Sequence, residues 1–439
     1  MAAIAMLGAF AACDSPLAPE PHPVAPLAVA PTEDHALAIS ANIRALHLPH
    51  GTIVDPVFAS SDPASPDYSR VVGYSRAGDA AIWTGHYLAA EAIRWRVTGD
   101  PDALDNARAA LDGIRGLVEV TGNGLLARFA LPVTSPWVES VTAEEGAKHG
   151  RYEGTVGGEP YYWFGNTSRD QYSGVFFGLA IAHDAIDDDA VRAEIRAVVS
   201  RMLDFLLRNG WNVRMPDGSY STTFLQRPDQ QLAFLQIGRR VNRARYGLLY
   251  LAHRSVLGTQ VRTPIQAECL DTHGSYYKFN LDHINLFNLV RLEPAASPYR
   301  AVYAEAFALL RSPQCTGTHP NAHFRTLERG LTGNAALDAP IASHLADWLE
   351  RPRRDYYIDH RGNPEYPPCG EDRSCVPIAI EEQVNTDFLW QRSPFLLYGG
   401  GDGTRETAGI DYILPYWMAR FYGIAGLDAA ALAAAEVEP

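Results

Sequence analysis

The chain has 439 residues and a formal net charge of -14 at pH 7. A chain of this length can bury a large core, and it fits either two or three average domains or one large helical toroid. The negative charge argues against nucleic acid or anionic lipid as a partner, because phosphate groups are bound by basic surfaces. We therefore expect no nucleic-acid partner.

The first thirteen residues, MAAIAMLGAFAAC, are small and apolar and end at Cys13. Residues 14–36 are rich in proline and alanine, which predicts a linker because proline interrupts helices. This start resembles a bacterial lipoprotein signal, although Phe10 stands where such signals carry leucine and no Lys or Arg precedes it. The resemblance implies lipidation of Cys13 and export to the periplasm or cell surface, with the lipid as the sole membrane attachment. An ordinary apolar start with an unrelated cysteine is the alternative.

Helical periodicity begins near Asp79. Apolar residues recur three and four positions apart through DAAIWTGHYLAAEAIRWRVTGD and then through DALDNARAALDGIRGLVEVTGN, which predicts two antiparallel helices. The layout returns in SRDQYSGVFFGLAIAHDAI and DDAVRAEIRAVVSRMLDFLLRNG, so that residues 83–85 (WTG) align with residues 172–174 (YSG). Repeated helical pairs must stack to bury their apolar faces.

Further helices are predicted in PDQQLAFLQIGRRVNRARYGLLYLAHRSV, YYKFNLDHINLFNLVRLE, SPYRAVYAEAFALLRS, APIASHLADWLER and DYILPYWMARFYGIAGL. The short stretches GLLARFALPV, DGSYSTTF and RRDYYIDH alternate like strands and are expected to be hairpin insertions. The glycine-rich segment YGGGDGTRET lacks the lysine of a phosphate-binding loop and is interpreted as a flexible loop over a cleft.

The helical pairs resemble the six- or seven-hairpin toroids, the (α/α) barrels of many glycoside hydrolases and polysaccharide lyases and of some terpene-handling enzymes. The resemblance depends on WTGHYLAAEAIRWRVTGDPDALDNARAALDGI and its echo in the second pair. It implies an all-α fold, an (α/α)6 or (α/α)7 barrel with short β-hairpin insertions, as one domain over residues 37–439. It also implies catalytic carboxylates at the ends of inner helices or in adjoining loops, acting on a carbohydrate substrate.

Polar residues at the starts of the repeated helices are the first candidate site. Arg169 and Asp170 open the second repeat, where the helix dipole favours an ionised acid, so Asp170 is a candidate base and Arg169 a candidate ligand contact. Tyr172, which follows in the first turn, is a further candidate substrate contact. Asp79 occupies the matching place in the first repeat. Trp83 and His86 lie one and two turns farther on and can share its face, so all three are candidate sugar contacts.

The helix YYKFNLDHINLFNLVRLE carries unusually many polar residues for one that reads as core. Asp282, His283 and Asn285 must either satisfy one another or face a wet cleft, because burying each without a partner costs roughly 1–3 kcal/mol. In a cleft, His283 would be a proton carrier near neutral pH and Asp282 would fix its tautomer. Asn285, and His323 in HPNAHF, are further candidate substrate contacts.

The stretch EEQVNTDFLWQRSPF combines carboxylates with aromatic residues. Glycoside hydrolysis needs one protonated and one ionised carboxyl group, and the predicted pair is Asp170 with Asp387 or Glu382. Trp390 and Arg392 would contact the sugar. Elimination by a lyase, a non-catalytic glycan-binding lipoprotein and an isoprenoid-handling enzyme remain alternatives.

Four cysteines follow Cys13, an even number that suggests disulfides in an exported chain. Cys369 and Cys375 bracket a short polar loop and are the expected bridge, which leaves Cys269 to pair with Cys315. Neither pair has the close spacing of a zinc site, so we expect no metal and no cofactor.

Overall fold

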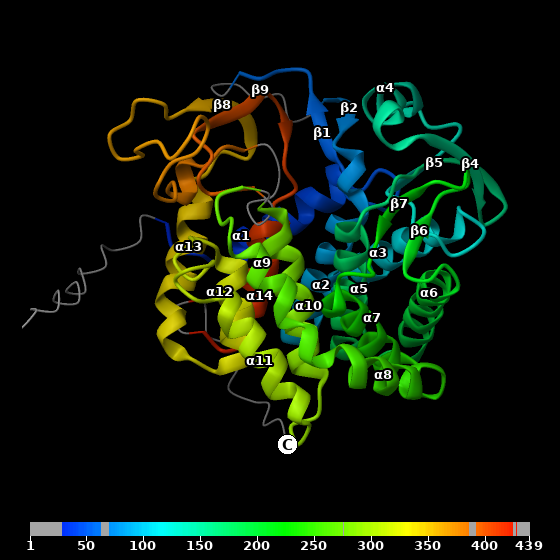
Figure 1. Ribbon diagram of the computed structural model, residues 1–439. Coiled ribbons are helices and arrows are strands. Elements are labelled where there is room, and N and C mark those ends of the chain that lie inside the picture. Colours follow the sequence, from blue (N-terminus) through cyan, green and yellow to red (C-terminus); the bar gives the residue numbers. More distant parts are fainter. Residues whose placement is uncertain (1–28, 63–69, 275, 386–391, 425–426, 428–439) are drawn as a thin grey trace, which may run out of the picture.

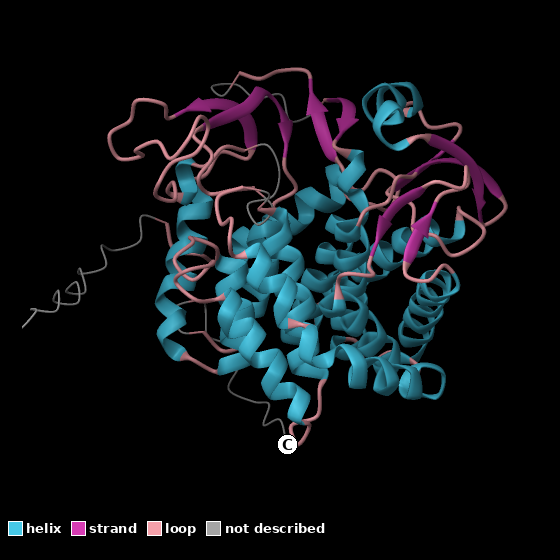
Figure 2. Cartoon of the chain, viewed as in Figure 1, coloured by secondary structure: helices cyan, strands magenta, loops and turns pink. Residues whose placement is uncertain are grey.

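The computed structural model describes residues 29–62, 70–274, 276–385, 392–424 and 427. Helices form the body of the molecule, and most strands gather toward one end, the top of the view in Figures 1 and 2. The helices are α1 (Glu33–Asn42), α2 (Ala80–Thr98), α3 (Pro101–Glu119), α4 (Val138–His149), α5 (Arg169–Ala185), α6 (Asp189–Arg208), α7 (Pro228–Val241), α8 (Arg243–Leu257), α9 (Arg262–Glu268), α10 (Tyr277–Leu292), α11 (Pro298–Leu310), α12 (Ala322–Thr332), α13 (Asp338–Glu350) and α14 (Ile410–Phe421).

The most buried helices contact one another in a closed cycle, which runs α2, α5, α7, α10, α12, α14 and back to α2. A second helix packs on the outside of each, and these outer helices are α3, α6, α8, α11, α13 and α1. Nearly every residue of α2 from Ala80 to Arg94 is buried, as is α5 from Gln171 to Ala182. The molecule is therefore mostly helical, with an inner layer of apolar helices and an outer amphipathic layer.

Short local signals set the ends of these helices. Asp100 accepts the N–H of Asp102 at the start of α3, where Pro101 occupies the first helical position. Asp188 caps α6 in the same way, by accepting the N–H groups of Ala190 and Val191. Gly99 ends α2 in the left-handed region with φ 68°. The sequence pattern therefore placed these hairpins correctly.

The aligned glycines of the two repeats bring α2 and α5 into close contact. A methyl group on Gly85 would lie 2.2 Å from the carbonyl oxygen of Gly174, and one on Gly178 would lie 2.1 Å from that of Gly85. Any larger residue at these positions would force the helices apart. The repeated glycines therefore have a packing role that the sequence alignment alone did not explain.

The strands are β1 (Asp55–Phe58), β2 (Val71–Ser75), β3 (Phe129–Pro132), β4 (Arg151–Val156), β5 (Glu159–Phe164), β6 (Asn212–Arg214), β7 (Tyr220–Thr223), β8 (Arg354–Asp359) and β9 (Tyr398–Glu406). They form a four-stranded sheet in the order β2-β1-β9-β8, a three-stranded sheet in the order β3-β5-β4, and the hairpin β6-β7.

Strand β9 corrects the sequence interpretation of YGGGDGTRET as a flexible loop. Its residues pair with β8 and, at Arg405, with Val57 of β1. The glycines fit a strand here because β8 lies too close for side chains: a methyl group on Gly400 would come within 2.2 Å of the Tyr356 carbonyl oxygen. Residues from the start and the end of the chain thus share one sheet.

Two disulfides and an N-terminal helix that starts earlier than expected complete the fold. The disulfides Cys269–Cys315 and Cys369–Cys375 are both present. Helix α1 begins at Glu33, inside the segment expected to be a linker, because Thr32 caps it and Arg420 of α14 donates to the Glu33 carboxylate at 2.9 Å. None of the helices in the described ranges combines the length and apolar character needed to cross a bilayer.

Candidate active site

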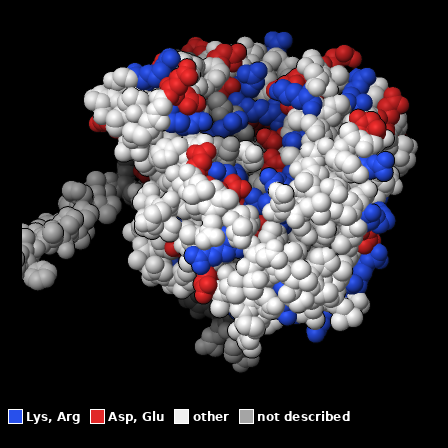
Figure 3. Space-filling model, viewed as in Figure 1, with Lys and Arg blue, Asp and Glu red and all other residues white. Residues whose placement is uncertain are grey.

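A polar cavity of about 390 Å³ opens where α2, α5 and α10 begin. Figure 3 shows acidic and basic side chains around a hollow in the upper part of this face. The lining combines basic, acidic and aromatic groups: Arg76, Gly78, Asp79, Arg128, Glu144, Glu145, Lys148, His149, Asp170, Tyr277 and Arg392. Such a surface suits a hydroxylated or charged ligand better than an apolar one.

Arg128 ties the starts of the two repeated helices together. It donates to the carbonyl oxygens of Gly78 at 2.7 Å and Asn166 at 3.0 Å, and to the Ser168 hydroxyl at 2.5 Å. Its Nη1 also lies 3.6 Å from Asp79 Oδ1. This side chain, which is almost fully buried, fixes the floor of the cavity.

Asp79 and Asp170 are held as hydrogen-bond acceptors at these helix starts. The Gln171 side chain donates to Asp79 Oδ1 at 2.9 Å and accepts the N–H of Ile82, so it joins α5 to α2. Asp170 Oδ1 accepts the Ser168 hydroxyl and the N–H of Gln171. These hydrogen bonds fix the orientation of both carboxyl groups at the mouth of the cavity.

Helix α4 forms one wall and contributes two neighbouring glutamates in different environments. His149 Nε2 lies 3.2 Å from Glu145 Oε2, and both groups press on Gly78, where a methyl group would come within 2.8 Å of His149 Nε2. Burial raises the pKa of Glu145, but hydrogen bonds from His149 and the Gly78 backbone outweigh it and leave that pKa below its usual value.

Glu144 has the opposite shift. Burial raises its pKa, the N–H of Arg76 opposes this through a hydrogen bond of 3.3 Å, and the charge of Glu145 raises it further. The cavity therefore holds two neighbouring carboxyl groups whose pKa values are shifted in opposite directions, that of Glu144 upward and that of Glu145 downward. Proton transfer to and from a bound substrate requires such a division.

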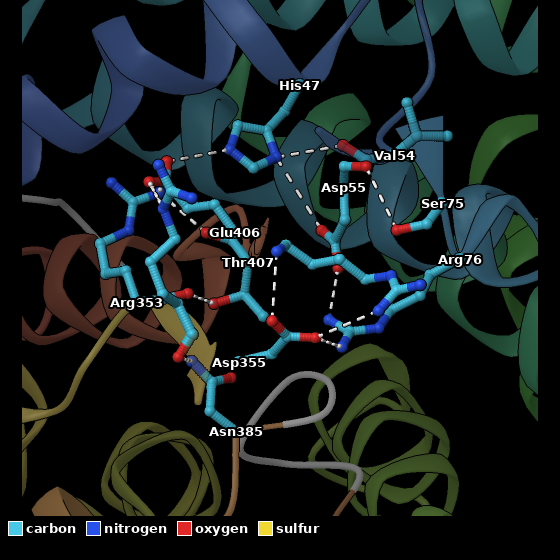
Figure 4. Close-up of polar contacts among 12 residues, drawn as sticks. His47, Val54, Asp55, Ser75, Arg76, Arg353, Asp355, Asn385, Glu406 and Thr407 are labelled. Carbon is cyan, nitrogen blue, oxygen red and sulfur yellow. Dashed lines mark hydrogen bonds and ion pairs between the residues drawn. The ribbon is translucent and has the colours of Figure 1, made fainter. Parts of the chain in front are cut away.

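Arg76 links the cavity to a buried charge network in the four-stranded sheet, drawn in Figure 4. Its guanidinium donates to Asp55 at 2.8 Å and to Asp355 at 3.1 Å. Its backbone is in the left-handed region, with φ 56°, which is unfavourable for a residue other than glycine. The two carboxylates hold it there, and this conformation directs its N–H to Glu144.

The network continues behind Arg76 to His47 and Glu406. His47 lies 3.6 Å from Glu406 and donates to the Val54 carbonyl oxygen at 3.0 Å. Burial raises the pKa of Glu406, but His47 and Arg353 outweigh it and lower that pKa to about 2. Burial also lowers the pKa of His47, although the nearby Glu406 carboxylate opposes this shift. These groups are part of the interior and support the cavity wall.

Of the residues predicted from the sequence, the structure places Asp79, Asp170 and Arg392 around this cavity. Arg169 begins α5 and is not part of the lining. Glu382 is exposed, accepts the hydroxyl of Tyr366, and also lies outside the lining. Cys13, Asp387 and Trp390 lie outside the described residues, so the predicted pairing of Asp170 with Asp387 stays a prediction.

The other predicted contacts are buried in the interior of the helical cycle: Tyr172, Trp83, His86, Asn285 and His323. The Tyr172 hydroxyl accepts the N–H of Leu126, and Asn285 donates to the Ser173 hydroxyl at 3.1 Å. The rings of His86 and His323 lie 5.9 Å apart, and burial lowers the pKa of His86 to about 4. Their positions favour packing over contact with a substrate.

Asp282 and His283 are also buried, not in the cleft expected for them. Asp282 accepts a hydrogen bond from Arg227, and His283 stacks on Phe324 with ring centroids 3.7 Å apart. Burial holds the pKa of His283 well below its ordinary value, so it is neutral near pH 7. The polar residues of α10 are therefore part of the interior, where Asn280 Oδ1, Asp282 Oδ2 and His283 Nε2 have no hydrogen-bond partner among the described residues.

Sequence reasoning missed Arg76, Arg128 and the acidic and basic residues of α4. A signal was present: Glu145 and His149 are four residues apart, so they share a helix face, and Arg128 is the one charge in the apolar stretch GLLARFALPV. In the described part of the chain, no three His, Cys, Asp or Glu side chains converge as metal ligands would.

No protein-family model matches the chain, and no curated protein matches it. Its structure is similar to a metagenome-derived glycoside hydrolase family 9 endoglucanase, with 15% identity, a TM-score of 0.46 and coverage of 89% of this chain and 80% of that one. It is also similar to cellobiose 2-epimerase from Spirochaeta thermophila, with 11% identity, a TM-score of 0.42 and coverage of 89% and 96%. TM-scores this low leave the function to be inferred from the cavity itself.

Proposed function

We propose that the chain is a carbohydrate-active enzyme, a glycoside hydrolase that binds its substrate in the cavity where α2, α5 and α10 begin. We propose further that the helical cycle is an (α/α)6 barrel and that it forms one catalytic domain, which begins at Glu33 with α1 and not at residue 37. The observation that carries the function is the pairing of Glu144, whose pKa is raised, with acceptor carboxylates in the same cavity. Hydrolysis of a glycosidic bond uses one protonated and one ionised carboxyl group.

In this proposal Glu144 is the general acid and Asp170 is the base or nucleophile. Both hydrogen bonds to Asp170 end on Oδ1, and within the described residues Oδ2 accepts none. Tyr277, which is 44% exposed at the start of α10, offers an aromatic face for a sugar ring. Asp79 and Arg128 would bind hydroxyl groups.

The test is turnover and binding of Glu144→Gln and Asp170→Asn on a panel of polysaccharides. A hydrolase should keep substrate binding and lose about 10²- to 10⁴-fold in kcat in each variant, the usual contribution of general acid-base catalysis. Glu139→Gln is the matched control, because Glu139 is exposed on the same helix, in the first turn of α4. A glycan-binding protein would instead lose affinity in a graded way and show no turnover, and that result would refute the proposal.

The basic residues around the cavity favour elimination on an acidic glycan as a second candidate. Arg76, Arg128, Lys148 and Arg392 line the cavity and could neutralise a uronic acid carboxylate, with the Tyr277 hydroxyl as the base. A lyase forms an unsaturated product, so ultraviolet absorbance during digestion of uronate polymers would identify this reaction. The charged lining is unsuited to an isoprenoid chain, which was a further alternative.

We also propose that the protein is exported and anchored through a lipid on Cys13. The disulfides support export, because such bonds persist in oxidising compartments. Fractionation of a bacterial host tests the anchor: the wild type should sediment with membranes, and Cys13→Ala should not. Equal distribution of the two proteins would refute lipidation.

A further inference from the structure

Helix α8, at the lower right of Figure 1, carries an apolar stripe on its solvent side. The helix packs on α7, and Tyr246 and Tyr250 are its buried residues. An outer helix normally turns polar residues to solvent. On α8 most of the exposed positions are instead apolar, and they recur three and four residues apart, so they form one stripe: Ala244, Leu248, Leu251, Ala252, Ser255 and Val256.

Three side chains of this stripe are large and open to solvent. Leu248 is 84% exposed, Val256 is 65% exposed and Leu251 is 40% exposed. Every other helix in the described part of the chain has at most one exposed large hydrophobic residue. Single exposed apolar residues are ordinary on a folded protein, whereas a contiguous apolar patch marks a surface that binds another molecule.

Arginines lie along both edges of the apolar stripe. With 3.6 residues per turn, Arg243 and Arg254 fall on one side of it and Arg245 on the other. Arg254 is paired with Glu293 and Arg245 with Asp204. Long basic side chains at the margin of an apolar face can keep their charge in the polar layer while the face itself is buried.

The charge of this region is opposite to that of the whole chain. Residues 230–267 contain six arginines and neither Asp nor Glu, although the net charge of the chain is -14. Arg239, Arg240 and Arg243 line a pocket of about 190 Å³ where α7 ends and α8 begins. Arg243 is exposed and forms no ion pair with any described residue, and the Arg240 side chain is 54% exposed although it contacts Asp184. The net charge, which argued against an anionic lipid partner, therefore does not describe this surface.

We propose that α8 docks on an anionic lipid bilayer, with the apolar stripe at the level of the headgroups and the neighbouring arginines on lipid phosphates. An amphipathic helix with basic margins binds membranes through its buried apolar area and its attraction to anionic lipids. A second copy of the chain fits this surface less well, because residues 230–267 of the two copies would bring arginines together without a carboxylate between them. The stripe lies outside the lining of the proposed active site, so docking does not depend on the activity assigned there.

The test is co-sedimentation of the full chain with vesicles of phosphatidylglycerol or of phosphatidylcholine. The chain carries Cys13→Ala, so that no lipid on this residue contributes. Binding should be at least about tenfold tighter to phosphatidylglycerol and should weaken as the salt concentration rises from about 0.05 to about 0.5 M, because salt screens the attraction. Leu248→Glu should abolish binding. Leu270→Glu is the matched control, because Leu270 is equally exposed but follows α9, outside the stripe.

A second variant tests the charge and leaves the apolar stripe intact. Arg243→Gln should weaken binding to phosphatidylglycerol vesicles about fivefold, the effect of one arginine near the bilayer surface. Arg214→Gln, exposed on β6, should not weaken it. In a fractionation experiment, a wash at high salt should release protein held by α8 and not protein held by a lipid on Cys13, so the two attachments are distinguishable.

Three results would overturn the proposal. The first is equal binding to the two lipids, and the second is a Leu248→Glu variant that binds as well as the chain without this change. The third is a dimer that Leu248→Glu separates and that does not bind vesicles, because the stripe would then be an interface between two copies of the chain.

Discussion

The cavity at the start of α2 and the cluster around Arg227 are built from the same residue types and differ in access to solvent. Arg227 contacts Asp229 through Nη2 at 2.9 Å, Glu268 through Nη1 at 2.5 Å, and Asp282. The side chains of Asp229 and Asp282 are fully buried, whereas Asp79 in the cavity is 27% exposed. Carboxylates thus serve packing in one place and are open to a ligand in the other.

The difference in solvent access follows from the side chains that surround the carboxylates in each region. In the Arg227 cluster the guanidinium is itself buried and its N–H groups are taken up by three carboxylates, so it presents no side to a ligand. Around the cavity, several carboxylates accept backbone N–H groups and side-chain amides or hydroxyls, which leaves part of their surface open. Whether carboxylates can take part in catalysis here depends on the neighbouring elements and not on their own helix.

The largest expected effect is on Arg227. Arg227→Met would leave Asp229 and Asp282 buried without a counter-charge, and the free energy of unfolding should fall by about 3–5 kcal/mol. Urea denaturation measures this. Arg245→Met is the control, because Arg245 pairs with Asp204 at an exposed site and its loss should be undetectable. Equal stability of the two variants would mean that the cluster is solvated.

A smaller loss is expected at the network behind the cavity. Asp355→Asn would place an amide N–H group near the guanidinium of Arg76, and the free energy of unfolding should fall by about 1–3 kcal/mol. Arg76 would lose one of the carboxylates that hold its φ of 56°, so kcat should fall as well. Asp359→Asn, exposed on the same strand β8, should change neither quantity. Normal turnover in Asp355→Asn would show that the network does not position Glu144.

In the Arg227 cluster, Asp282 should make the stability of the fold depend on pH. Burial raises the pKa of Asp282 to about 7, with Asp229 and Glu268 adding to the shift and Arg227 opposing it. The folded state then holds a proton that the unfolded state releases near pH 4, so this group's contribution to stability falls as pH rises from about 4 to 7. The slope is at most about 1.4 kcal/mol per pH unit.

The measurement is the difference in unfolding free energy between wild type and Asp282→Asn across that range. Relative to the variant, the wild type should lose stability with rising pH and then level off above pH 7. A difference that is constant with pH would mean that Asp282 is ionised in the fold at all these values.

The helical pairs could be predicted because their signals are local. Asp100 and Asp188 cap helices whose apolar spacing is visible in the sequence, and the strand-like pieces became β3, β7 and β8. Strand β9 was missed because its glycines read as a loop, and its partners β1 and β8 are distant in sequence. Only the tertiary structure shows that those glycines accommodate a neighbouring backbone.

The candidate site was predicted less well than the helices, because its geometry depends on contacts between residues that are distant in sequence. Asp79 and Asp170 could be identified because helix starts are recognisable, and the structure places both in the cavity. Asp282 and His283 stand in an equally polar pattern, yet they are buried because Arg227 and Phe324 come from other parts of the chain. Glu144 gained its raised pKa from burial in the fold, which the local sequence does not encode.

The smallest expected effect on stability is at Tyr277, and it separates the two candidate reactions. Tyr277→Ala removes an exposed ring, so the free energy of unfolding should change by less than about 0.5 kcal/mol, whereas KM should rise several-fold through lost stacking. Tyr220→Ala, exposed on β7 outside the cavity lining, is the control. Tyr277→Phe keeps the ring and removes only the hydroxyl. A hydrolase should tolerate that change, but a lyase that uses this hydroxyl as its base should lose kcat, and such a loss would favour elimination.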